Sequence, residues 1–181
     1  TYKLVVEEFE KYGIAYDFIN DSSTEAFQEK IRPETKVIYT ESPSNPLMSI
    51  VDLEQIAALA RENNLISMVD NTFATPINQN PIALGIDIVI HSGTKYLGGH
   101  SDLCFGAVVS SHKLMQKIRN SATNYGGSLN PLDCYLIERS LKTLAVRVEK
   151  HNQNAMDLAK FLQQEEQVAQ VYYPGLENHP E

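Results

Sequence analysis

Lys95 lies in the segment of this chain whose residue types are best suited to chemistry. Residues 87–102 read Asp-Ile-Val-Ile-His-Ser-Gly-Thr-Lys-Tyr-Leu-Gly-Gly-His-Ser-Asp, so an apolar run ends shortly before the lysine and two glycines follow it. The hydroxyl side chains of Ser92 and Thr94 precede it. An amine held in such a place can lose its proton and form an imine with a carbonyl compound.

A second apolar run, upstream of the first, ends in a carboxylate. It reads Met-Val-Asp-Asn-Thr over residues 68–72 and places Asp70 at its end. Pyridoxal phosphate (PLP) needs an imine-forming lysine and an acid that keeps its pyridine nitrogen protonated. Taken alone, Asp70 would more readily be a turn or capping residue. Taken together, the two residues predict that Lys95 holds PLP and moves the substrate α-proton, while Asp70 faces the ring nitrogen.

Further side chains are predicted to bind the same cofactor. The hydroxyls of Ser92 and Thr94 can donate to phosphate oxygens, and Gly93 between them allows close backbone approach. Asn45, on the loop Ser-Asn-Pro, can donate to the ring hydroxyl oxygen or to a substrate carboxylate, and Thr72 can pack against one ring face. The alternative roles are ordinary loop and turn hydrogen bonds.

Other chemistries find less support in the sequence. His91, His100 and Asp102 crowd the lysine segment, but their spacing matches no standard metal-ligand set, and we expect His100 to buttress the loop. We find no nucleotide-binding glycine motif and no nucleophile elbow. The net charge of −8 disfavours nucleic acid and anionic membranes as partners. The two cysteines fit no zinc motif or disulfide framework, which favours a cytoplasmic protein.

Hydrophobic periodicity predicts alternating helices and strands. Apolar runs too short to cross a bilayer predict strands at 14–19, 36–40, 65–69, 86–90, 104–109 and 167–173. Helices are predicted at 3–12, from a cap at 22–24 through 31, at 52–63 with Asp52 as cap, and at 111–123, 131–143 and 145–166. This alternation predicts a three-layer α/β/α fold with a mostly parallel sheet, whose strand ends carry the Asn45 loop, Asp70 and Lys95. Residues 1–145 would belong to a large PLP-binding domain, and 146–181 to a linking helix and the start of a small one.

Several motifs together resemble one known enzyme family. They are residues 41–46 (Glu-Ser-Pro-Ser-Asn-Pro), 69–76 (Val-Asp-Asn-Thr-Phe-Ala-Thr-Pro), 92–96 (Ser-Gly-Thr-Lys-Tyr), 99–102 (Gly-His-Ser-Asp), 133–136, 139–144 and 173–176. They resemble the Cys/Met-metabolism PLP enzymes, which include cystathionine γ-synthases, cystathionine β- and γ-lyases, methionine γ-lyases and O-acylhomoserine sulfhydrylases. The resemblance spans essentially the whole chain.

The resemblance implies a fold and a set of roles. The fold is the aspartate-aminotransferase type (fold type I). Lys95 would form the imine with PLP, Asp70 would face the pyridine nitrogen, and Ser92 and Thr94 would bind the phosphate. Asn45 matches the family's asparagine near the ring oxygen and the substrate carboxylate. Members are usually homotetramers, built as dimers of dimers that share active sites.

Parts of the family pattern have no counterpart here. They include the N-terminal arm that reaches a neighbour's phosphate, the phosphate loop, the ring-stacking tyrosine and the C-terminal arginine that binds the substrate carboxylate. We therefore expect a fragment that binds PLP poorly and turns over little by itself. For the parent protein we expect a carbon–sulfur lyase acting on cystathionine or a related sulfur amino acid. A γ-synthase or sulfhydrylase, an aminotransferase and a non-catalytic scaffold are the alternatives, and the position of elimination stays open.

Overall fold

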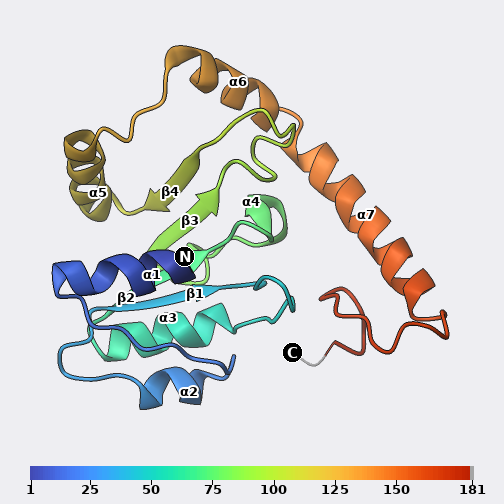
Figure 1. Cartoon of the computed structure of the whole chain (residues 1–181), viewed down its shortest axis with the longest axis horizontal. Helices are drawn as coiled ribbons and strands as arrows, with labels where there is room; N and C mark the ends of the chain where they lie inside the picture. The colour runs from blue at the N-terminus through green and yellow to red at the C-terminus, as the bar shows by residue number, and fades with distance from the viewer. Residues whose placement is uncertain (180–181) are drawn as a thin grey trace.

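The computed structural model describes residues 1–179, and its centre is a four-stranded sheet (Figure 1). The strands are β1 (Val37–Glu41), β2 (Ile66–Asp70), β3 (Ile88–Ser92) and β4 (Gly106–Ser110), in that spatial order. The first three run parallel, and β4 runs antiparallel to β3. The predicted, mostly parallel α/β sheet is confirmed.

The main core lies between this sheet and α3 (Leu53–Glu62). Apolar residues three and four positions apart give the helix one apolar stripe, in which Ile56 is fully buried. Successive strand residues point to opposite faces of a sheet, so Ile38, Val69 and Val89 all meet this helix. Figure 1 shows α2 (Thr24–Glu29) and α3 on one side of the sheet and α1 (Tyr2–Glu8) on the other.

The predicted helices are all present. Besides α1, α2 and α3 they are α5 (His112–Tyr125), α6 (Pro131–Leu141) and α7 (Leu144–Leu162), and a 3-10 turn (η1, Phe9–Tyr12) continues α1. The short helix α4 (Thr75–Asn78) was not predicted. No helix within residues 1–179 combines the length and the apolar character that a membrane crossing requires.

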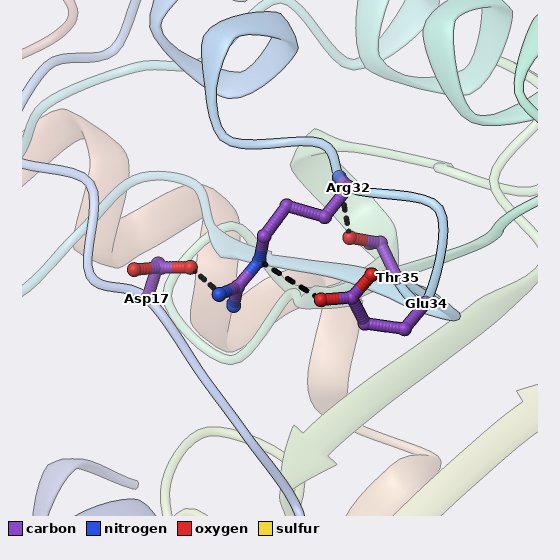
Figure 2. Close-up of polar contacts among 4 residues, drawn as sticks. All are labelled: Asp17, Arg32, Glu34 and Thr35. Carbon is purple, nitrogen blue, oxygen red and sulfur yellow. Dashed lines mark hydrogen bonds and ion pairs between the residues drawn. The ribbon is translucent and has the colours of Figure 1, made fainter.

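Two of the predicted strands are wrong: residues 14–19 and 167–173 have no regular secondary structure. Both segments have β-like composition, but a strand needs a neighbour for its backbone hydrogen bonds, and the sheet of the described residues ends at β1 and β4. Side chains hold the first segment instead. Figure 2 shows Arg32 donating to the Asp17 carboxylate at 2.6 Å, with its Nε 3.9 Å from Glu34.

Asp52 caps α3, as predicted, and its loss should weaken the core. Its carboxylate accepts the backbone N–H of Gln55 at 3.0 Å, which lowers the pKa of Asp52 below its ordinary 3.8. Asp52→Ala should therefore reduce the free energy of unfolding in urea by about 1 kcal/mol at pH 7. Because the folded pKa is depressed, this difference is present above pH 3.8 and shrinks as the pH falls below it. Exposed Glu54 provides the control: Glu54→Ala should change stability much less, and equal losses would contradict the capping role.

Candidate active site

Three polar side chains end the parallel strands at one edge of the sheet. Glu41 pairs with Asp70, Asp70 pairs with Ile90, and Ser92 follows Ile90 by two positions. Because side chains alternate along a strand, Glu41, Asp70 and Ser92 share the face opposite to α3. The sheet thus brings together two residues of the predicted PLP site, Asp70 and Ser92, from strands far apart in the sequence.

Thr72 joins these two strand ends. Its hydroxyl donates to Oδ1 of Asp70 at 2.5 Å and accepts the backbone N–H of Ser92 at 2.7 Å. The Thr72 N–H donates to the same carboxylate oxygen at 3.0 Å. Two donors on one oxygen fix the orientation of the Asp70 carboxylate. The sequence predicted Thr72 as a packing residue for the ring, and the structure gives it this additional positioning role.

The negative charge of Asp70 affects the pKa values of three groups around it. Burial raises the pKa of Glu41, and the charge of Asp70 raises it further, while the Asn45 N–H bonded to the Glu41 carboxylate lowers it. Burial also raises the pKa of Tyr39, with Asp70 adding to the effect. For His91, burial lowers the pKa and Asp70 opposes the change. Asp70 therefore acts as the central anion of this edge.

Lys95 lies on a compact turn after β3. Its N–H donates to the carbonyl of Ser92 at 3.1 Å, the Gly98 N–H to that of Gly93 at 2.8 Å, and the Gly99 N–H to that of Lys95 at 2.7 Å. These bonds hold the backbone of the turn, while the Lys95 side chain is exposed. A Cβ at Gly93 would overlap the ring of Phe105, so only glycine fits there without a shift. The turn thus presents the amine from a fixed backbone.

The Thr94 hydroxyl fastens this turn to the strand that follows. It accepts the N–H of Phe105 at 3.1 Å and lies 3.4 Å from the Phe105 carbonyl oxygen. Its predicted contact with phosphate stays a prediction. His100 buttresses the turn, as expected, because its Nδ1 lies 2.8 Å from the Gly98 carbonyl oxygen. Within residues 1–179 no group of three His, Cys, Asp or Glu side chains is arranged to hold a metal ion.

Asn45 is exposed on the loop that follows β1, and the side-chain amides of Gln79 and Asn71 hold the start of that loop. The Gln79 side chain donates to the Ser42 carbonyl at 3.0 Å and to the Asn71 side chain at 2.7 Å. Asn71 in turn donates to the carbonyls of Thr75 and Gln79. Asn71 and Ser42 are both fully buried. The sequence analysis missed Asn71 and Gln79; the amide directly after Asp70 was the available signal.

Comparison with known proteins identifies the family. The family model described as Cys/Met metabolism PLP-dependent enzyme matches residues 1–181. The chain belongs to this family. The resemblance seen in the motifs is thereby confirmed.

Similar proteins agree with this assignment. The chain is 46% identical to a cystathionine beta-lyase of Lactococcus lactis subsp. cremoris, covering 99% of this chain and 48% of the relative. It is 45% identical to a cystathionine gamma-lyase of Bacillus subtilis, with the same two coverages. Thus the chain spans about half the length of the curated relatives it matches. The crystal structure of cystathionine gamma-lyase from Lactobacillus plantarum complexed with L-serine superposes with a TM-score of 0.96 at 39% identity, covering 99% of this chain and 47% of that one. This likeness confirms the type I PLP fold.

The side chains present at this edge fit PLP. An oriented carboxylate at Asp70 suits a protonated ring nitrogen, and a hydroxyl at Ser92 suits a phosphate. The exposed amine of Lys95 rises from the turn that Ser92 begins. The acid and the hydroxyl therefore occupy one sheet edge, and the turn that carries the amine begins there.

Removal of the Thr72 hydroxyl should loosen the site and lower stability. Thr72→Val keeps the shape of the side chain but leaves the half-buried Ser92 N–H without its acceptor and Asp70 without one donor. We expect a loss of about 1–3 kcal/mol in the free energy of unfolding, measured in urea. Thr72→Ser retains the hydroxyl and should stay close to the unaltered protein. Equal stabilities of the valine and serine variants would contradict the bridge.

Proposed function

We propose that the complete protein is a PLP-dependent carbon–sulfur lyase that cleaves cystathionine or a related sulfur amino acid. The observation that carries this proposal is the Asp70 carboxylate, oriented by Thr72 and joined through it to Ser92, where the Lys95 turn begins. The names of the similar lyases from Lactococcus lactis and Bacillus subtilis support the substrate class.

Bound PLP would supply an electron-accepting ring that stabilises negative charge at the substrate α-carbon. Asp70 would hold a proton at the ring nitrogen, and Ser92 and Thr94 would donate to the phosphate. Lys95 would carry the covalent link to the cofactor aldehyde. The Lys95 amine, when free of the cofactor, would take the proton from the substrate α-carbon. Asn45, at the rim, would donate to the ring oxygen or to the substrate carboxylate.

The same proposal extends to the oligomeric state and the cellular location of the complete protein. Large apolar side chains are exposed on neighbouring helices, among them Leu132 at 65%, Tyr135 at 62% and Val146 at 70%. Such a surface is suited to burial against another protein surface, which supports a homotetramer of the complete protein. We propose a cytoplasmic enzyme. Residues 1–145 would belong to the PLP-binding domain and 146–181 to the link to a smaller one; residues 180–181 lie outside the described part of the chain.

Replacement of the predicted lysine tests the enzyme proposal directly. In the complete protein, Lys95→Ala should abolish the visible absorbance of lysine-bound PLP and reduce turnover by on the order of 100-fold or more. The matched control is Lys113→Ala, at the start of α5, because Lys113 is also exposed but lies outside the site. A Lys95→Ala protein that keeps its absorbance and its turnover would instead favour a non-catalytic scaffold.

The products formed from cystathionine decide the position of cleavage. With water consumed and ammonia released, β-cleavage should give pyruvate and homocysteine, whereas γ-cleavage should give 2-oxobutyrate and cysteine. A Bacillus subtilis relative, 44% identical, is named a cystathionine gamma-synthase/O-acetylhomoserine (thiol)-lyase, so replacement is the second candidate. Formation of cystathionine from an activated homoserine and cysteine, without cleavage of cystathionine, would contradict the lyase proposal and favour the synthase.

A further inference from the structure

The guanidinium of Arg147 lies against the turn that carries Lys95. Arg147 belongs to α7, whose first turns run beside the loop that follows β3 (Figure 1). Its Nη1 donates to the carbonyl of Tyr96, the residue directly after the lysine, at 2.8 Å. This contact joins residues 51 positions apart in the sequence.

Two further hydrogen bonds anchor the same guanidinium to the end of α6 and the residue that precedes α7. Nη2 donates to the Ser140 carbonyl at 3.0 Å, and Nε donates to the Thr143 hydroxyl at 3.1 Å. A planar guanidinium offers donors in a fixed fork, so bonds to three acceptors hold it in one place. Arg147 thus ties the lysine turn to the junction between α6 and α7.

Gly99 provides the space that the guanidinium occupies. The backbone at Gly99 has a φ of 77°, and a Cβ there would overlap Nη1 of Arg147. The N–H of this same glycine donates to the Lys95 carbonyl. Arg147 therefore lies against the backbone of the turn at two points after the lysine, Tyr96 and Gly99.

Apolar contacts from α7 reinforce this arrangement. Leu97, two residues after the lysine, is buried with Leu144 and Val148 of the helix. The rings of Tyr96 and His151 meet edge to face, with centroids 5.6 Å apart. One face of α7 therefore packs along the turn, and Arg147 is its only hydrogen-bonding contact with Tyr96 among those recorded in residues 1–179.

We propose that Arg147 is a positioning residue that holds the Lys95 backbone in the geometry needed for proton transfer. The proposal rests on the proposed function of Lys95 and adds to it a distant residue that acts only through the turn. Loss of the guanidinium frees the Tyr96 carbonyl and opens the space above Gly99. The lysine then approaches the substrate α-carbon less accurately.

The first test uses the cofactor-free protein and needs no turnover. In Arg147→Met, hydrogen–deuterium exchange at the Gly98 and Gly99 amides should accelerate by on the order of tenfold. The Asn71 amide, which donates to Ile90 in the sheet, should change much less. Ala159→Gly is the control, because Ala159 is buried near the other end of α7 and its replacement lowers helix stability without touching the turn. Equal acceleration at all three amides, or none at the glycines, would overturn the proposal.

The second test is kinetic and uses the complete enzyme. With kcat expressed per bound cofactor, Arg147→Met should lower kcat by roughly tenfold to 100-fold and leave KM nearly unchanged. Arg147→Lys keeps the charge but not the fork and should recover part of kcat, and Ala159→Gly should lose none. An unchanged kcat, or a loss confined to KM, would overturn the proposal.

Thr143→Val keeps the proposal testable if Arg147→Met does not fold. It removes one of the three acceptors of the Arg147 guanidinium. Amide exchange at Gly98 and Gly99 should therefore accelerate and kcat should fall, both by smaller factors than in Arg147→Met. No change in either quantity would overturn the proposal. Failure of the proposed function is distinguishable from failure of this inference. It would appear as retained turnover in Lys95→Ala, whereas the amide exchange of the cofactor-free protein is measured without turnover and does not depend on the role of Lys95.

Discussion

One threonine hydroxyl sets the geometry on which the candidate site depends. Between Asp70 and Ser92, the Thr72 Oγ1 uses its hydrogen toward the carboxylate and a lone pair toward a backbone N–H. The two partners lie at the ends of neighbouring parallel strands. Since a hydroxyl is both donor and acceptor, it can donate to the carboxylate and accept the backbone N–H at the same time. The orientation of the acid and the start of the lysine turn are thereby coupled.

The rest of the molecule secures the two loops that flank this bridge. On one side the buried amide of Asn71 and the half-buried amide of Gln79 hold the segment that leads to Asn45. On the other side Arg147 and the apolar face of α7 hold the turn of Lys95. Buried polar groups of this kind are costly when unpaired, so once satisfied they favour a single arrangement of the loops. The sheet thus places the strand ends, and residues distant in the sequence hold the two loops that follow them.

The side chains of Lys95 and Asn45 are both exposed, on the segments that follow β3 and β1. The relatives of this family are about twice as long as the chain, and their names describe cleavage or synthesis of sulfur amino acids. We therefore regard the edge described here as the acid-and-lysine half of a site, whose remaining walls the complete protein would supply. The expectation that the 181 residues alone bind PLP weakly stays a prediction.

The sequence by itself determined the local features. Periodicity located α3 and the three parallel strands, and the chemistry of single residues identified the cap at Asp52. It limited the cap of α2 to residues 22–24, among which the structure has Ser23. Residue type and spacing also singled out Lys95 and Asp70, because an amine and an acid at consecutive strand ends must meet at one sheet edge. Only the tertiary structure decided that 14–19 and 167–173 are not strands, since pairing depends on a neighbour that composition does not reveal. It alone showed the roles of Gln79 and Arg147, because their hydrogen bonds span 37 and 51 positions and exist only once strands and helices have docked.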